Sequence, residues 1–302
     1  MNTTPTPTAD SLHVQHNGRG ILLMGLAFFT FTLVDTIAKL LTDATHPFEV
    51  VWFRQAGLLV AAVLIVARRG PRVFRSRHTG LQIARGAMVA LASMLFVSGI
   101  RFVPLADAVA VSFIAPFVVT IGGAVFLREH VGPHRWAAIA IGFVGVLIVL
   151  RPGLGVMQPA MVLVLGSATL FALRQLMSRV IARDDSTATT IVYSAFAGSA
   201  VLTLTLPWVW TWPSDPKVWA LLAALAVLAG IAEALVFRAL EIAEAVVVTP
   251  LHYTTIVWAS VWGFLVFGQF PDGWTWVGTA IIIATGLYTV HRERLAAKAR
   301  QG

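Results

Sequence analysis

The chain has 302 residues, of which 58% are hydrophobic and only 12% are charged, and its formal net charge at pH 7 is +8. Soluble domains carry about 25% charged residues, so this composition excludes an ordinary water-soluble protein and favours one that crosses a membrane several times. Cysteine is absent, which excludes a disulfide framework, a thiolate metal site and a cysteine nucleophile.

Residues 1–17 are polar and rich in Thr and Pro, which predicts a disordered tail. The apolar stretch that begins at Gly20 is too long for a signal peptide and lacks a small-residue cleavage site. Pro, Gly and charged residues then separate a series of apolar segments. The sequence predicts ten spanning helices: Gly20–Leu41, Phe48–Ala67, Gly80–Ile100, Pro104–Leu127, His134–Leu150, Gln158–Val180, Ala188–Leu206, Lys217–Ala239, Val246–Phe267 and Trp274–Val290.

The segment 104–129 recurs in the second half of the chain. Residues 106–109, ADAV, match residues 243–246, AEAV, and Glu129 matches Gln269 at an offset of 140. Five spans is an odd number, so the second copy must run antiparallel to the first. Inverted repeats of this kind are typical of transporters that work by alternating access.

We therefore expect an all-α integral membrane protein whose ten transmembrane helices form two inverted five-helix repeats. The expected division of the chain is a cytoplasmic tail at 1–19, the first repeat at 20–150, a linker at 151–157, the second repeat at 158–290 and a basic cytoplasmic tail at 291–302.

The distribution of Lys and Arg predicts the orientation. With the N-terminus in the cytoplasm, the inner segments hold 15 of these residues and the outer ends hold 3. This bias predicts that both termini are cytoplasmic. It also explains the positive charge through contact with anionic lipid, so the bilayer is an expected partner and nucleic acid is not.

Charged residues within the spans are candidate sites, because an unpaired charge there costs about 2.5–3.5 kcal/mol or more. Asp35 and Lys39 share one face of the first helix, and Arg54 lies at a similar depth to Asp35 in the second. One interpretation is a polar wall that binds substrate. The other is a structural ion pair, with Lys39 extending toward the membrane surface.

Three further charges share a depth nearer the cytoplasm: Arg85, Arg174 and Glu233. They form either a gating or coupling group or an interfacial ion pair. Arg174 is also the repeat counterpart of Asp35, at an offset of 139.

Two prolines predict breaks in spanning helices, Pro116 in the fourth span and Pro250 in the ninth. Breaks at membrane depth are tolerated where the freed backbone is buried or lines a cavity. His252 and Tyr253 follow the second break and are candidate substrate ligands. Trp258 lies near the midplane, either as a stacking surface for a flat substrate or as ordinary packing against neighbours or lipid.

The remaining function classes lack their signatures. The chain has no HExxH, no GxSxG, no nucleotide-binding motif and no clustered metal-ligand set. We therefore expect no catalytic residue, no metal and no cofactor. An intramembrane enzyme and a channel are both disfavoured against a secondary transporter with a small-molecule substrate.

Several segments resemble the EamA-type transporters of the drug/metabolite transporter superfamily: DTIAK (35–39), HPFEVVWFR (46–54), PLADA (104–108), FLREHVG (126–132), RPG (151–153) and TPLHY (249–253). The resemblance extends over about residues 20–290. It implies a location in the bacterial inner membrane and a small organic metabolite as cargo. Gln269 departs from the pattern, since many second halves carry a Glu there, like Glu129 in the first.

Proteins similar in these segments include bacterial uptake proteins for riboflavin and S-adenosylmethionine, while broader relatives export amino acids. Uptake of a flat, vitamin-like cargo such as riboflavin is the leading expectation, because the chain contains 10 tryptophans. Export of amino acids, drugs or other metabolites is the alternative. A homodimer is a further expectation that the sequence leaves open.

Overall fold

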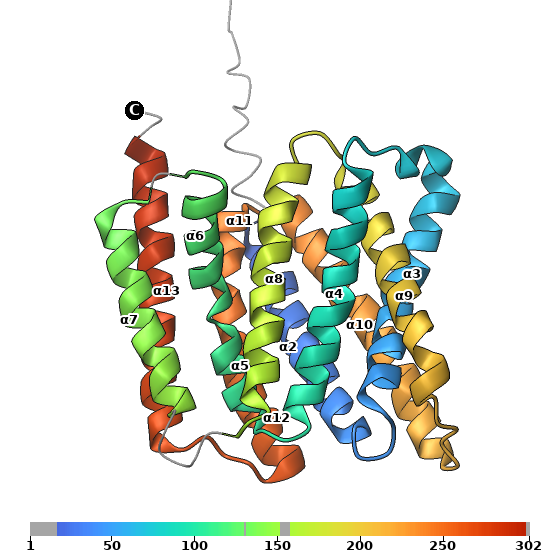
Figure 1. The fold of residues 1–302 in the computed structure, drawn as a ribbon. Helices are drawn as coiled ribbons and strands as arrows, with labels where there is room; N and C mark the ends of the chain where they lie inside the picture. Colours follow the sequence, from blue (N-terminus) through green and yellow to red (C-terminus); the bar gives the residue numbers. More distant parts are fainter. Residues whose placement is uncertain (1–16, 130, 152–157, 300–302) are drawn as a thin grey trace, which may run out of the picture.

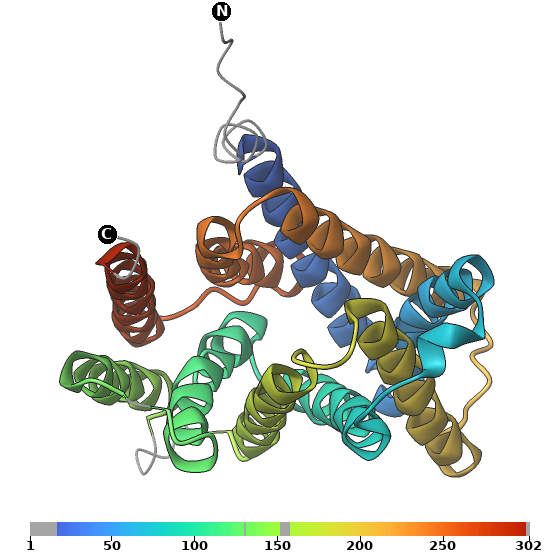
Figure 2. The same cartoon turned by 90° about the horizontal axis from the view of Figure 1, so that it is seen from above.

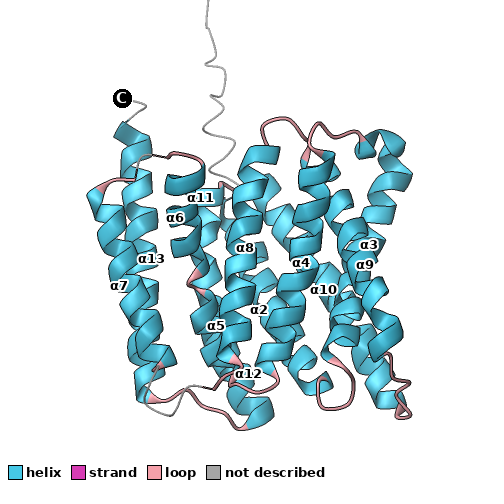
Figure 3. Ribbon diagram, viewed as in Figure 1, coloured by secondary structure: helices cyan, strands magenta, loops and turns pink. Residues whose placement is uncertain are grey.

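The computed structural model describes residues 17–129, 131–151 and 158–299, and these residues form helices joined by short loops (Figures 1 and 3). The helices are α2 (Asn17–Leu41), α3 (Pro47–Arg69), η1 (Pro71–Phe74), α4 (Thr79–Ile100), α5 (Leu105–Ser112), α6 (Ala115–Phe126), α7 (Pro133–Leu150), α8 (Met161–Ile181), α9 (Thr187–Val209), α10 (Pro216–Ile242), α11 (Ala245–Val248), η2 (Thr249–Tyr253), α12 (Thr254–Phe267) and α13 (Gly273–Ala299).

Within the described residues, 10 helical segments are long and apolar enough to cross a membrane. The prediction of an all-α protein with ten spanning helices is confirmed. Local chemistry defines many of the helix starts. The side chains of Ser186 and Asp215 accept hydrogen bonds from the backbone at the N-termini of α9 and α10.

The helices stand in two rows, which are visible from above (Figure 2). One row contains α13, α11–α12, α2, α10 and α3, and the other contains α7, α5–α6, α8, α4 and α9. Within the rows, α2 packs on α10 and α12, and α8 packs on α4 and α6. Between the rows, α3 packs on α9, α5 on α12 and α7 on α13.

These contacts are symmetric under exchange of the two halves of the chain. Each helix of the first half has a counterpart in the second: α2 and α8, α3 and α9, α4 and α10, α5–α6 and α11–α12, α7 and α13. The exchange converts the α2–α10 contact into α8–α4, and the α3–α10 contact into α9–α4. Every one of these contacts joins a helix of one half to a helix of the other, so the halves interlock.

Two close helix crossings depend on glycine. A Cβ added at Gly57 of α3 would lie 2.9 Å from the backbone nitrogen of Gly230 in α10, and one added at Gly198 of α9 would lie 3.3 Å from the carbonyl oxygen of Gly86 in α4. Small residues let helix backbones approach closely in membranes. The two crossings are counterparts, so the same device is used on both sides of the molecule.

The fourth and ninth spans are interrupted. Between α5 and α6 the chain leaves the helix at Phe113 and Ile114, and Pro116 lies in the first turn of α6. In the ninth span, Pro250 lies in the tight helical turn η2. Because proline has no N–H to donate to the carbonyl four residues earlier, each helix ends or tightens just before it.

Both broken spans end in the same turn, at opposite ends of the bundle. Arg128 and Gly268 have positive φ angles of 54° and 65°. The next residue in each case, Glu129 or Gln269, donates its backbone N–H to the carbonyl of Gly123 or Gly263, at 3.0 Å in both. We call the end that carries the 70–78 and 182–186 loops, where α13 ends (Figure 1), the terminal face, and the other end the distal face.

Candidate functional site

A group of ionisable side chains lies between the two rows of helices, away from either end. The group consists of Asp35 (α2), Arg54 (α3), Arg85 (α4), Arg174 (α8) and Glu233 (α10), and we call it the central charge cluster. Both halves of the chain contribute to it. Glu233 lies within electrostatic range of Arg174, Arg54 and Arg85. The sequence predicted Arg54 at a different depth from the other two arginines, but all three act on this one carboxylate.

Asp35 and Arg54 form an ion pair. Nη1 of Arg54 donates to Oδ1 of Asp35 at 2.6 Å, and the two side chains remain 22% and 13% exposed. Both side chains are therefore mostly buried, and a small part of each remains exposed. The pair joins α2 to α3 within the first half.

Arg85 joins α4 to two helices of the second half. Its Nε donates to the hydroxyl of Ser178 at 2.7 Å, and its Nη1 donates to the hydroxyl of Ser194. Both hydroxyls in turn donate to backbone carbonyls one helical turn earlier. These serines were not identified from the sequence. The available signal was their spacing, since Ser178 lies four residues after Arg174 and Ser194 is the counterpart of Arg54 at an offset of 140.

Arg174 is held differently. Its guanidinium carbon lies 4.4 Å from the ring centroid of Phe171, as in a cation–π contact. Its buried Nε has no hydrogen-bond partner among the described atoms. Arg174 is therefore a charged donor at membrane depth whose hydrogen-bonding capacity is not fully used.

Lys39 does not join Asp35 and Arg54 in the central charge cluster. Its buried Nζ donates to the carbonyl of Val103 and lies 5.2 Å from the ring centroid of Phe267. The nearest carboxylates acting on it are those of Asp43 and Asp107. Lys39 therefore belongs to the distal face.

The ends of α6 and α12 carry repeat-related contacts of different chemistry. At the terminal face, Nη1 of Arg179 donates to both carboxylate oxygens of Glu129, at 3.0 and 3.1 Å. The counterparts of this pair at the distal face, at an offset of 140, are Lys39 and Gln269. Among the described atoms, the buried Oε1 of Gln269 has no hydrogen-bond partner. The terminal face thus has an ion pair where the distal face has none.

Other polar contacts close the distal face. Thr275 of α13 donates its hydroxyl to Asp107 of α5 at 3.1 Å, and Arg151 at the end of α7 pairs with Asp272 at 2.5 Å. The hydrogen bond from the backbone N–H of Thr275 has the largest effect on the Asp272 carboxyl and lowers its pKa below the ordinary value. Burial opposes this effect, and Arg151 adds to the lowering. These contacts tie α5, α7 and α13 together.

The aromatic candidates lie where the two broken spans meet α2. The His252 ring stacks on Phe28 of α2 at 4.9 Å, and the Tyr253 ring stacks on Phe113 at 4.8 Å. His252 is exposed although rings flank it on two sides. Trp258 contacts the ring of Phe29 edge-on at 5.0 Å. In the described contacts these three candidates meet aromatic rings and not the central charge cluster.

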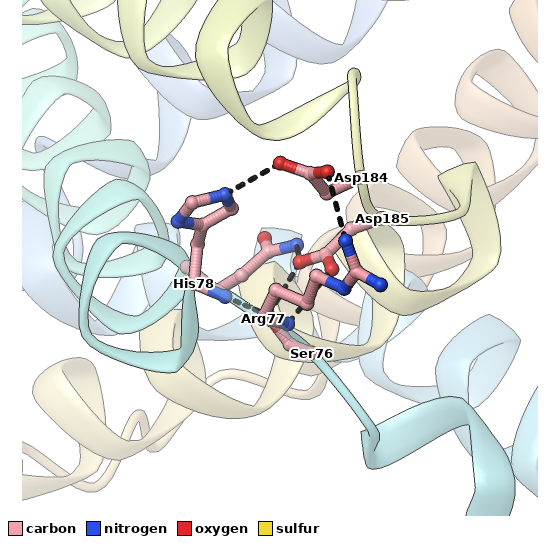
Figure 4. Close-up of polar contacts among 6 residues, drawn as sticks. Ser76, Arg77, His78, Asp184 and Asp185 are labelled. Atoms are coloured by element: carbon pink, nitrogen blue, oxygen red, sulfur yellow. Dashed lines mark hydrogen bonds and ion pairs between the residues drawn. The ribbon is translucent and has the colours of Figure 1, made fainter.

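A separate polar network pins two loops at the terminal face (Figure 4). Asp185 accepts hydrogen bonds from the hydroxyl of Ser76, from the backbone N–H of Arg77 at 3.0 Å and from the amide of Gln82 at 2.9 Å. Asp184 meets His78 at 2.8 Å and Arg77 at 3.5 Å. Burial disfavours the charged carboxylate of Asp185, but the hydrogen bonds outweigh it and lower its pKa.

Side chains that could bind a metal ion were sought among the described residues. In the described part of the chain, no three His, Asp or Glu side chains are grouped so that they could hold a metal ion.

Comparison with known proteins gives consistent results. The riboflavin transporter of Vibrio cholerae is 29% identical over 283 residues, which cover 92% of this chain and 95% of that protein. The S-adenosylmethionine uptake transporter of Rickettsia conorii is 26% identical, covering 91% and 95%. The pseudopaline exporter of Pseudomonas aeruginosa is 26% identical, covering 87% and 93%.

A solved structure, titled "Crystal structure of protein", shares the fold with a TM-score of 0.59 at 19% identity, covering 89% of this chain and 98% of that one. Residues 18–151 and 158–290 each match the EamA-like transporter family. The matched segments include nearly all the helices described above. The chain is a multi-pass membrane transporter of small molecules, not an enzyme, and it belongs to the EamA-like transporter family.

Proposed function

We propose that the protein takes up a flat organic metabolite such as riboflavin across the bacterial inner membrane by alternating access. The observation that carries this proposal is the central charge cluster, to which both halves contribute and in which Asp35 and Arg54 remain partly exposed. Sites at the interface of inverted repeats are where such transporters bind their substrates.

The aromatic rings beside the broken spans supply the argument for a flat cargo. His252 stacks on Phe28 at 4.9 Å and Tyr253 stacks on Phe113 at 4.8 Å, while Phe113 and His252 lie 4.9 Å apart with their rings tilted. The exposed His252 can offer a ring nitrogen to a ligand. Aromatic stacking contributes about 0.5–1.5 kcal/mol beyond the burial of area. Riboflavin, for which one relative described above is named, contains a flat ring system, and so does S-adenosylmethionine, for which another is named.

Export is the second candidate, because one relative is named an exporter. Alternating access between two equivalent halves has no built-in direction, and the gradients of cargo and coupling ion determine the net flux. The excess of Lys and Arg on the terminal face favours a cytoplasmic location for that face and for both termini.

Uptake by purified protein in proteoliposomes tests the function directly. Wild-type protein is expected to accumulate riboflavin. If Trp258 lies on the cargo path, Trp258→Phe lowers the affinity slightly and Trp258→Ala lowers it about tenfold, because about 1.4 kcal/mol corresponds to one decade. Trp208→Ala, which alters an 81% exposed tryptophan at the periphery, is the matched control and leaves the affinity unchanged.

Normal uptake by Trp258→Ala would remove Trp258 from the cargo path. Wild-type protein that neither binds nor moves a flavin would refute riboflavin as the cargo. A panel of other metabolites then identifies the substrate class.

A further inference from the structure

We propose that Arg174 is a binding residue for a planar oxygen-bearing group of the cargo, such as a carboxylate or the dicarbonyl edge of an imide, and that the site rejects cationic cargo. This inference rests on the proposed function, since it gives the chemistry of the cargo at the same central site. Three observations support it, and they are independent of the names of the relatives.

The first observation is the unused donor capacity of Arg174. Phe171 covers one face of its guanidinium, at 4.4 Å from the ring centroid. Its buried Nε lacks a hydrogen-bond partner among the described atoms. A guanidinium stacked in this way is fixed in its plane, and the edge of that plane matches the two oxygens of a carboxylate or an imide.

The second observation is the balance of charge. The central charge cluster contains three arginines and two carboxylates. Asp35 is bonded to Arg54 at 2.6 Å. Glu233 alone then acts on Arg174, Arg54 and Arg85. The cluster carries one positive charge in excess, which an anionic or oxygen-rich group compensates and a cation aggravates.

The third observation comes from the repeat. In the first half, Asp35 neutralises Arg54. At the offset of 140 that relates the end of α2 to the end of α8 and the start of α3 to the start of α9, the positions of Asp35 and Arg54 correspond to Gln175 and Ser194. Both residues are uncharged, so the second half has no carboxylate beside Arg174 at the position equivalent to that of Asp35. A carboxylate or imide on the cargo would supply the missing acceptor.

Three small probes of one shape test the charge preference without assuming a cargo: benzoate, benzamide and benzamidine. Thermal unfolding of purified protein in detergent is measured as each probe is titrated. Wild-type protein is expected to be stabilised by benzoate, less by benzamide and not by benzamidine. In Arg174→Gln the apparent Kd for benzoate rises at least tenfold, and Arg174→Lys shows a smaller loss because a lysine lacks the planar fork.

The unliganded variants separate binding from structural support. If Arg174 awaits a ligand, Arg174→Gln removes the positive charge that the two carboxylates of the central charge cluster leave in excess, so its Tm without probe equals or exceeds that of wild type. Arg54→Gln is the matched control, because it leaves Asp35 without its partner and is expected to lower the Tm.

The proposal is overturned if benzamidine stabilises wild-type protein as well as benzoate does, or if Arg174→Gln retains wild-type affinity for benzoate. Benzoate binding that depends on Arg174, in a protein that moves no flavin, would refute riboflavin as the cargo and leave the subsite intact. Flavin uptake unaffected by Arg174→Gln would refute the subsite and leave the proposed function intact.

Discussion

Asp185 shows how single side chains hold the terminal face together. It accepts hydrogen bonds from Ser76, Arg77 and Gln82, which come from the loop before α4 and from its first turn (Figure 4). Asp185 itself follows α8. One carboxylate therefore fixes the position of a loop more than one hundred residues away in the chain, and it accepts these hydrogen bonds most strongly when it is ionised.

The hydrogen bonds that the Asp185 carboxylate accepts make the stability of the protein depend on pH. Because folding lowers the pKa of Asp185, its contribution to stability is present above the ordinary value of about 3.9 and is lost as the pH falls through the lowered value. Asp185→Asn is expected to have a lower Tm than wild type at pH 7, and the difference should be smaller at pH 3, below the ordinary pKa of a free Asp. Asp184→Asn, which alters the neighbouring carboxylate, is the control and should change the Tm less. An equal Tm difference at both pH values would contradict this role.

For single residues, the sequence predicts how deep a side chain lies along its spanning helix better than it predicts which groups that side chain contacts. Helix rise is constant at about 1.5 Å per residue, so the similar depth of Asp35 and Arg54 could be inferred before their ion pair was seen. The rotation of each helix is set by packing with distant segments. For that reason Lys39, one turn from Asp35, bonds instead to Val103, and the serines that hold Arg85 were not anticipated.

At the level of whole helices, the sequence again predicts some features and leaves others open. Proline predicts that a helix is interrupted, since its missing N–H removes one hydrogen bond and its ring clashes with the preceding turn. The form of each interruption differs. The fourth span bends at Phe113 and Ile114, whereas the ninth tightens into η2 before α12 begins. Local sequence does not determine this choice, because the two interruptions pack against each other through Phe113 and Tyr253.

The ends of α6 and α12 provide a prediction about gating. Gln269→Glu is expected to form an ion pair with Lys39 at the distal face, equivalent to the pair of Glu129 and Arg179 at the terminal face. Because an added ion pair must break when the distal face opens, the uptake rate should fall while the Tm rises. The stabilisation is expected to be on the order of 1 kcal/mol. Initial uptake rates and thermal unfolding in detergent measure both effects.

Two further variants make this prediction specific. Gln269→Leu removes the unpartnered oxygen without adding a charge, so it should not slow uptake. In Gln269→Glu combined with Lys39→Met, the new carboxylate has no lysine to pair with, and the added stability should be lost. If Gln269→Glu has the same uptake rate and the same Tm as wild-type protein, the distal face does not close through the contact between Lys39 and residue 269.

For the whole molecule, the number of spans and their inverted repeat could be predicted from the sequence. Hydropathy shows the spans, and the similarity between the two halves of the sequence shows the repeat. The structure confirms ten spanning helices in the described residues. The interlocking of the halves could not be predicted. It depends on which helix faces are complementary, and a pair such as Gly57 and Gly230 is recognised only once α3 and α10 are seen together.

Orientation in the membrane is testable because the chain has no cysteine. The exposed residues Arg75 and Ser214 lie at the terminal and distal faces. In intact cells, Ser214→Cys should react with an impermeant thiol reagent from outside, and Arg75→Cys should react only after the membrane is opened. Labelling of both from the same side would contradict the arrangement of ten spans, and reversed labelling would place the termini outside.

The interlocked contacts also affect how the protein is made. The main neighbour of α2 is α10, which the ribosome adds roughly 200 residues later, after about 10–40 s of synthesis. The first five helices therefore enter the bilayer before most of their partners exist. Asp35 and Arg54 both belong to this early half, so they can neutralise each other during that interval. Arg85 has no such partner until Ser178 and Ser194 arrive, and its burial is a late step of membrane insertion.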